Sequence, residues 1–264
     1  MIDVHRWAAL SVFLAATGAL AAEPPVSGGK EGAQTNVILV HGAFADASSW
    51  RKVIPLLEAK NLHVVAVQLP ETSIEEDVAA TKRALSIQKG AVVLVGHSYG
   101  GMVITAAADD PNVRALVYVT ALMPEQGESA GDLIGRFPPP PGGAHIVPQA
   151  GDFLWLDPSA YHEMFCPDVP AADARVLTAV EKPIHKSAFA AKLTAVARWH
   201  DLPTWYVVTS KDKMLSPELQ KFLAQRAKAK TTTVTTSHVP FLSKPQEVAR
   251  VIVEAARFKA KPQP

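Results

Sequence analysis

The sequence lacks the features of disulfide-rich proteins, of nucleic-acid-binding proteins and of proteins that hold a metal or a phosphate-bearing cofactor. Its single cysteine, Cys166, among 264 residues cannot form a disulfide within the chain. Lysine and arginine total 26 against 25 aspartates and glutamates, so no excess of charge indicates binding to nucleic acid or to an anionic membrane. The sequence also has no cluster of metal ligands and no glycine-rich phosphate loop, so we expect neither a metal nor an organic cofactor.

One apolar run stands near the N-terminus, where Arg6 precedes residues 7–20. The run is short for a membrane span, and Ala19-Leu20-Ala21 has the A-x-A form of a secretory cleavage site. We therefore expect residues 1–22 to be a signal peptide, with an uncleaved anchor as the alternative. The mature protein is then exported, either periplasmic or secreted, with no stable membrane association.

The rest of the chain is long enough for one α/β domain around a single core. Residues 23–35, rich in glycine, proline and polar residues, are predicted to be a flexible lead, and residues 36–264 to be the domain. Within it, apolar runs suited to strands alternate with stretches of helical spacing. This alternation predicts a parallel sheet with helices on both faces.

The sheet is predicted from short, apolar or β-branched runs. Strands are expected at 36–40, 63–67, 92–95, 115–120, 203–209 and 231–235. Helices, which show apolar residues at helical spacing, are expected at 48–60, 72–88, 102–108, 217–228 and 245–258. The pattern changes over residues 122–200, where the proline-rich stretch 137–143 is expected to be extended and short helices are expected at 157–165, 171–181 and 187–196.

Gly96-His97-Ser98-Tyr99-Gly100 matches G-x-S-x-G, a motif in which a serine lies at the tip of a sharp strand-to-helix turn. Glycine is needed there because a Cβ would clash with neighbouring backbone. Glycine and serine are also common in ordinary turns, so a turn without a catalytic serine is the alternative. The β-branched run before the motif and the apolar helix after it favour a turn that exposes the hydroxyl of Ser98 to a substrate.

With this motif the chain resembles the α/β-hydrolases, from about residue 36 to residue 258. The segments HGAFADASSW, GHSYGGM, TSKDKMLSP and SHVPF are most similar to a small-cap branch that includes plant methylesterases, hydroxynitrile lyases and bacterial esterases. The resemblance implies an α/β-hydrolase fold with a mostly parallel central sheet. It also implies a small helical cap, at roughly 122–200, inserted before the strand that bears the catalytic acid.

The resemblance further implies a catalytic triad in the order serine, acid, histidine. Ser98 corresponds to the nucleophile and His238 to the base. Asp212, just beyond a late strand, corresponds to the acid, and Glu125 is the alternative because some family members place the acid there. Asp201 is a weaker option, since it precedes the strand.

In the same family two backbone N–H groups bind the oxyanion of the tetrahedral intermediate. By resemblance these belong to Ala43 and Tyr99, with Phe44 as the alternative if the loop turns one residue later. His41 and His97 are expected to hold loops rather than to act as bases. The cap residues Leu154, Trp155, Tyr161, Phe165 and Phe189 are candidates to line an acyl or alcohol pocket, with one or two of them doing so.

These features predict a serine esterase that cleaves small carboxylic esters through an acyl-enzyme intermediate. Hydroxynitrile lyases of the branch have a lysine directly after the catalytic histidine, whereas this chain has Val239, which favours ester hydrolysis. Lyase-like or cofactor-free perhydrolase chemistry on the same triad, and a binding protein without turnover, are the alternatives. The expected partner is a small-molecule ester, and the sequence leaves the oligomeric state open.

Overall fold

The computed structural model describes residues 35–258. The predicted signal peptide at 1–22, all but the last residue of the lead at 23–35, and the end of the chain at 259–264 lie outside the described residues. Among residues 35–258, none of the helices has the length and apolar character needed to cross a membrane.

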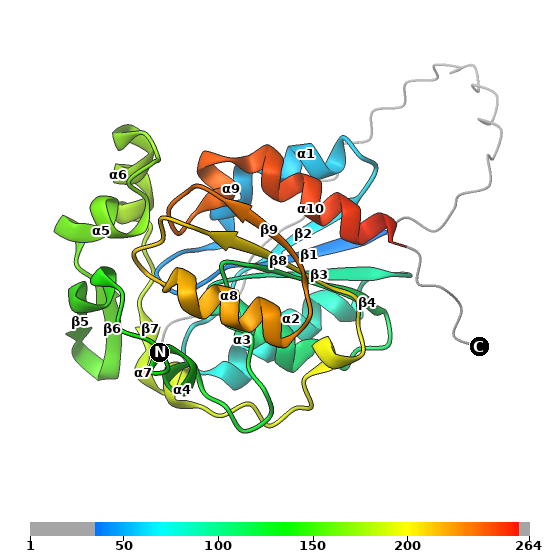
Figure 1. The fold of residues 1–264 in the computed structure, drawn as a ribbon, viewed down its shortest axis with the longest axis horizontal. Coiled ribbons are helices and arrows are strands. Elements are labelled where there is room, and N and C mark those ends of the chain that lie inside the picture. The colour runs from blue at the N-terminus through cyan, green and yellow to red at the C-terminus, as the bar shows by residue number, and fades with distance from the viewer. Residues whose placement is uncertain (1–34, 259–264) are drawn as a thin grey trace, which may run out of the picture. The chain divides into compact units, whose positions relative to one another are not determined.

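The domain is built on a six-stranded parallel sheet with the order β2-β1-β3-β4-β8-β9. Its strands are β1 (Asn36–Val40), β2 (His63–Val67), β3 (Val92–His97), β4 (Val113–Val119), β8 (Thr204–Thr209) and β9 (Lys230–Val234). Every residue of β1, β3 and β8 is buried, as expected of strands covered on both faces. The predicted parallel sheet and α/β-hydrolase architecture are confirmed (Figure 1).

Helices cover both faces of this sheet: α1 and α10 lie on one side, and α2, α3 and α8 on the other (Figure 1). Their bounds are α1 (Ile54–Glu58), α2 (Ile74–Ser86), α3 (Gly100–Ala107), α8 (Pro217–Arg226) and α10 (Pro245–Arg257). The side chain of Ser73 caps α2 by accepting a hydrogen bond from the N–H of Glu76. The core-facing stripe of α10 includes Val248, Val251 and Ile252.

The helix expected at 48–60 is present as two shorter helices. A 3-10 helix at Ala47–Lys52, capped by Asp46, precedes the short helix α1, and Pro55 stands in the first turn of α1. Proline has no N–H to donate and is tolerated at the start of a helix, so the chain begins a new helix there. A further short helix, α9 (Pro240–Ser243), follows His238 and was not predicted.

The segment between β4 and β8, here called the insertion, contains both helices and strands. Its helices are α4 (Ala130–Ile134), α5 (Pro158–Phe165), α6 (Ala171–Ala179) and α7 (Lys186–Ala190). A three-stranded antiparallel sheet accompanies them, formed by β5 (Ile146–Gln149), β6 (Phe153–Leu156) and β7 (Ile184–His185). The predicted helical cap therefore also contains a small antiparallel sheet, which was not predicted.

Two further expectations for the insertion are corrected by the structure. The helix expected at 187–196 ends at Ala190, and Lys192 forms an isolated antiparallel bridge with Ser129. The stretch 137–143 is not extended throughout, because a 3-10 helix begins at Pro141. The N–H of Gly142 in this helix donates to the carbonyl of Lys213, at 2.8 Å, which ties the insertion to the loop after β8.

Backbone hydrogen bonds join the two ends of the insertion. The N–H of Gly127 donates to the carbonyl of Leu193 at 2.7 Å, and the N–H of Leu193 donates to the carbonyl of Glu128 at 2.9 Å. The indole N–H of Trp199 adds a third link by donating to the carbonyl of Pro124 at 2.9 Å. The insertion therefore leaves the sheet and returns to it through one closed stem.

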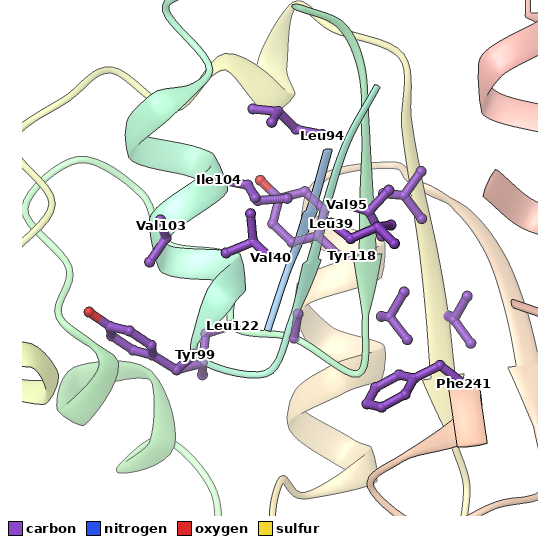
Figure 2. Close-up of a cluster of buried hydrophobic side chains, with 14 of the residues drawn as sticks. Leu39, Val40, Leu94, Val95, Tyr99, Val103, Ile104, Tyr118, Leu122 and Phe241 are labelled. Carbon is purple, nitrogen blue, oxygen red and sulfur yellow. The ribbon is translucent and has the colours of Figure 1, made fainter. Parts of the chain in front are cut away.

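The core between the sheet and α3 fixes the end of β3. Val40 of β1 and Leu94 of β3 face α3, which contributes Val103 and Ile104, whereas Leu39 and Val95 point to the opposite face of the sheet (Figure 2). Fully burying an aliphatic side chain of this size stabilises a fold by about 1.5–3 kcal/mol. The packing on both sides of residues 96–99 thus holds the strand-to-helix turn in one position.

Candidate active site

Ser98 stands in the turn between β3 and α3 with a φ of 50°, in the left-handed region. A non-glycine residue in a sparsely populated region costs about 1–3 kcal/mol and persists only where the surroundings hold it. Here the surroundings are close, since a Cβ on Gly96 would lie 2.7 Å from the carbonyl oxygen of Gly100. A Cβ on Gly101 would overlap the carbonyl of Leu122, whose own N–H donates to the carbonyl of Ser98 at 3.0 Å.

His238 lies in the loop after β9 and is 2% exposed. Its Nδ1 is 2.8 Å from Oδ2 of Asp212, which follows β8. The imidazole packs against two rings, with centroid distances of 4.7 Å to His97 and 5.1 Å to Phe165. Ser98 and His238 line one cavity of about 50 Å³. The structure thus brings Ser98, His238 and Asp212 to the same end of the sheet.

Asp212 is surrounded by hydrogen-bond donors. Its Oδ2 accepts from the hydroxyls of Thr120 and Thr209, at 2.6 and 3.0 Å, and from the side-chain amide of Gln220 at 2.9 Å. Its Oδ1 accepts from the backbone N–H groups of residues 214 and 215, at 2.8 and 2.9 Å. None of these donors was predicted, because threonine and glutamine carry no distinctive signal in the sequence.

His238 and these donors together determine the charge of Asp212. Burial alone would raise the pKa of Asp212, but the charge and hydrogen bond of His238, the Thr120 hydroxyl and the Leu215 amide lower it below its ordinary value of 3.8. An ionised carboxylate only accepts hydrogen bonds, so Nδ1 of His238 carries the proton. The other ring nitrogen, Nε2, is then free to accept a proton.

The alternative acids lie elsewhere. The carboxylate of Glu125 contacts the exposed His200, with 3.0 Å between Oε2 and Nε2. Asp201 pairs with Arg198 at 3.4 Å on the surface. The structure therefore places Asp212, and neither Glu125 nor Asp201, beside His238.

The predicted oxyanion donors Ala43 and Tyr99, and the alternative Phe44, all line the cavity with Ser98. None of their three N–H groups donates to an acceptor within residues 35–258. Phe44 has a φ of 62°, and its carbonyl accepts a hydrogen bond from the hydroxyl of Tyr161 at 3.0 Å. A Cβ on Gly42 would lie 2.6 Å from that of Ser98, so this loop passes directly beside the nucleophile.

His41 and His97 hold loops, as expected. Nε2 of His97 is 2.9 Å from the carbonyl of His238, and burial, reinforced by His238, holds the pKa of His97 well below 6.5. His41 accepts from the N–H of Leu69 through Nε2, at 3.0 Å, and donates through Nδ1 to the carbonyl of Gly42, at 2.9 Å. Burial lowers the pKa of His41 to about 4, so both rings are neutral near pH 7.

A second buried carboxyl lies beside His41. Oε1 of Glu71 is 3.9 Å from Nδ1 of His41, and the side chain is fully buried. Within the described residues neither of its carboxyl oxygens has a hydrogen-bond partner. Burial raises the pKa of Glu71 well above 4.5, although the charge of Lys182 opposes this.

The cavity at Ser98 is mainly apolar. Of the five insertion residues proposed as a lining, the structure places Phe165 and Phe189 there. The apolar lining residues that were not predicted are Leu122, Ile134, Ile146, Met214 and Leu215. They come from separate segments, so no local pattern could identify them. In the part of the chain that the structure describes, no three His, Cys, Asp or Glu side chains are grouped so that they could hold a metal ion.

Comparison with known proteins gives a family by sequence and a matching fold by structure. Residues 37–251 match the sequence profile of the alpha/beta hydrolase family. Methylesterase 1 of Arabidopsis thaliana is 25% identical over 264 residues, covering 86% of this chain and 98% of that protein. A carbendazim hydrolyzing esterase of Nocardioides sp. is 50% identical over 128 residues, covering 42% of this chain and 52% of that protein.

Among solved structures, a pyrethroid hydrolase from Sphingobium faniae superposes with a TM-score of 0.73 at 23% identity. The superposition covers 84% of this chain and 97% of that chain. At this identity the likeness shows the fold alone, and it agrees with the six-stranded sheet described above. The profile match, by contrast, spans most of the chain and includes Ser98, Asp212 and His238. The chain belongs to the alpha/beta hydrolase family, and its relatives include methylesterases and other ester-cleaving hydrolases.

Proposed function

We propose that the protein is a serine esterase that cleaves small carboxylic esters through an acyl-enzyme intermediate. The observation that carries this proposal is the position of His238, which is 2.8 Å from an ionised Asp212 and lines the same cavity as Ser98. A serine hydroxyl is a weak nucleophile unless a neighbouring base accepts its proton. This arrangement supplies such a base and fixes its tautomer.

In the proposed reaction, Oγ of Ser98 attacks the ester carbonyl while Nε2 of His238 accepts the hydroxyl proton. Asp212 stabilises the imidazolium that results, and the N–H groups of Ala43 and Tyr99 bind the oxyanion. A single oxyanion donor contributes about 3 kcal/mol to the transition state. The imidazolium then protonates the departing alcohol, and water attacks the acyl-enzyme with His238 again acting as base.

The cavity supports a short, uncharged group as the part of the substrate held beside Ser98. Its volume of about 50 Å³ is well below the roughly 300–1,000 Å³ of pockets that hold drug-sized ligands. Its lining includes no Asp, Glu, Lys or Arg side chain. We therefore expect a small acyl or alkyl group of the ester to lie beside Ser98.

Ester hydrolysis is favoured over cyanohydrin cleavage by the residue after the histidine. Val239 is 1% exposed and offers no ammonium group to the site. The names of the methylesterase and of the carbendazim hydrolyzing esterase also support an ester as substrate.

The test is hydrolysis of p-nitrophenyl esters, from acetate to long acyl chains, by the mature protein and by Ser98→Ala. The exposed Ser86→Ala, on α2, is a matched control that should keep the wild-type rate. We expect Ser98→Ala to lose at least about a thousandfold in kcat and the parent to prefer short acyl chains. An inert but folded parent, or an equally active Ser98→Ala variant, rules out the serine esterase.

We also propose that the mature protein is exported after cleavage near Ala22. The support is the apolar run at residues 7–20 with its A-x-A site. N-terminal sequencing of the protein recovered outside the cytoplasm of the producing cell tests this. Full-length protein confined to the cytoplasm would contradict it.

A further inference from the structure

The residue after the nucleophile is anchored through its side chain. Tyr99 is 1% exposed, and its ring points away from the sheet (Figure 2). Its hydroxyl donates to Oδ2 of Asp77, on α2, at 2.7 Å, and its ring centroid lies 5.8 Å from that of Phe189 in the insertion. Both ends of this side chain are therefore held, and the backbone of the same residue supplies a proposed oxyanion donor.

Asp77 uses both carboxylate oxygens. The side chain is fully buried, and its Oδ1 accepts from the N–H of Glu71 at 2.7 Å. Glu71 has a φ of 62°, and its carbonyl accepts from the N–H of His185 in β7 at 2.8 Å. A series of hydrogen bonds thus runs from the insertion through Glu71 and Asp77 to Tyr99.

We propose that Asp77 is a positioning residue, which orients the oxyanion-binding N–H of Tyr99 through the tyrosine hydroxyl. This inference rests on the proposed esterase function. Asp77 lies outside the set of residues that line the cavity, so it acts on the reaction only through Tyr99.

The physical reason is the strained turn at Ser98. A residue with positive φ is held by its surroundings, and the peptide between Ser98 and Tyr99 can relax by rotating if one side of the turn is released. Rotation of that peptide would turn the N–H away from the developing oxyanion. A misplacement of about 1 Å in a catalytic group can lower a rate by about a hundredfold.

The test compares Tyr99→Phe, Asp77→Ala, their double variant and Asp77→Asn in ester hydrolysis. We expect kcat to fall about threefold to tenfold in Tyr99→Phe and about tenfold to a hundredfold in Asp77→Ala, with KM within about twofold of the parent. The double variant should be no slower than Asp77→Ala, because both changes remove one interaction. Asp77→Asn, which keeps an acceptor for Glu71 and can donate to the tyrosine oxygen, should restore most of the rate.

A second measurement reports on the oxyanion site without turnover. Trifluoroacetone forms a hemiketal when Ser98 Oγ bonds to its carbonyl carbon, with the hydroxyl proton passing to His238 and the negative charge to the ketone oxygen. Acetone, which forms far less adduct, is the matched probe. The inhibition constant of trifluoroacetone should rise in each variant in parallel with the loss in kcat/KM, since the adduct resembles the transition state.

Tyr118→Phe is the control for lost stability alone. It removes another buried tyrosine hydroxyl, which lies 2.7 Å from Oγ1 of Thr105. It should lower Tm without changing the inhibition constant of trifluoroacetone. If Asp77→Ala and Tyr99→Phe also lower only Tm, the inference is overturned.

The outcomes separate this inference from the proposed function. A parent that hydrolyses no ester but binds trifluoroacetone through Ser98 refutes the esterase, while the inhibition constants of the variants still decide the role of Asp77. An active parent whose variants keep kcat and the inhibition constant refutes only the role of Asp77. A parent with neither activity nor adduct refutes both.

Discussion

Two buried carboxyl groups lie beside two buried histidines in this domain, and their protonation states are opposite. Asp212 is 2.8 Å from His238 and its pKa is lowered, whereas Glu71 is 3.9 Å from His41 and its pKa is raised. Burial favours the neutral form of both groups. The comparison teaches that the close contact with His238 and the hydrogen-bond donors around Asp212, rather than burial, decide which carboxyl carries charge.

The donors differ because the two carboxyl groups lie on different parts of the sheet. Asp212 follows β8, which lies between β4 and β9, and Thr120 after β4, Thr209 at the end of β8 and Gln220 on α8 converge on it. Glu71 stands in the loop between β2 and α2, and its own N–H is taken by Asp77. The nearby ammonium of Lys182 donates to the carbonyl of Leu69.

The largest expected effect on activity follows from removing the negative charge of Asp212 beside His238. Asp212→Asn should lower kcat about ten-thousandfold, because an amide in this place favours the wrong tautomer of His238. Glu125→Gln, at the acid position that the structure leaves on the surface, should change kcat less than about twofold. Steady-state hydrolysis of a short-chain ester measures both. A mild loss in Asp212→Asn with a severe one in Glu125→Gln would reverse the assignment.

A smaller effect is expected when Asp212 keeps its charge but loses one donor. Thr120→Val should lower the free energy of unfolding at pH 7 by about 1.5–3 kcal/mol, as for a hydrogen bond to a charged group. Thr105→Val, which breaks hydrogen bonds between neutral groups only, should cost about 0.5–1.5 kcal/mol. Urea unfolding measures both values.

The two threonine variants should also differ in their dependence on pH. A carboxyl whose folded pKa is lowered contributes stability above its ordinary pKa of 3.8, and this stability is lost as the pH falls through the folded pKa. Thr120→Val raises the folded pKa of Asp212, so this variant should lose less stability on acidification than the parent. Thr105→Val should lose as much stability as the parent. An equal loss of stability at acidic pH in the two variants would show that the Thr120 hydroxyl does not help to set the charge of Asp212.

The smallest expected effect is on Glu71, and its sign is opposite. A carboxyl with a raised folded pKa holds its proton more tightly when folded, so the protein loses stability as the pH rises from 4.5 toward that pKa. Glu71→Gln removes this loss. The difference in free energy of unfolding, variant minus parent, should therefore be more positive at pH 8 than at pH 5.

This measurement does not depend on the absolute stability of the glutamine variant. Burial also raises the pKa of Asp77 and, to about 8, that of Glu181. Both groups contribute to the pH dependence of stability in variant and parent alike, so their contributions cancel in the difference. Activity at pH 7 should stay within about threefold, since Glu71 does not line the cavity. A difference that falls between pH 5 and pH 8 would mean that Glu71 is ionised and paired.

The sequence was sufficient to predict the parts that depend on local pattern. The strands of the parallel sheet are continuous apolar runs, and the turn at Ser98 needs glycines at fixed positions, so both leave a local signal. The segments that contain Asp212 and His238 were found by their place after the last two strands. The choice of Asp212 over Glu125 needed the structure, because both residues follow a strand.

The remaining features depend on contacts between distant segments. β5, β6 and β7 are two to four residues long, and β6 pairs with β7 across about thirty residues of chain, so neither length nor periodicity marks them. The donors to Asp212 and the anchor of Tyr99 on Asp77 are ordinary polar residues that only the fold brings together. The helix expected at 187–196 failed because Lys192 pairs with Ser129 instead.

The closed stem of the insertion separates the insertion from the strands of the parallel sheet on either side of it. Because Leu193 bonds to both Gly127 and Glu128, we expect that the segment between them can be exchanged for that of a relative without altering the register of β4 or β8. Such a chimaera would keep Ser98, Asp212 and His238, and the relative's segment would have to replace the contact of Phe165 with the ring of His238. Substrate preference could then change through replacement of the insertion alone, while the reacting residues remain at the ends of the strands of the parallel sheet.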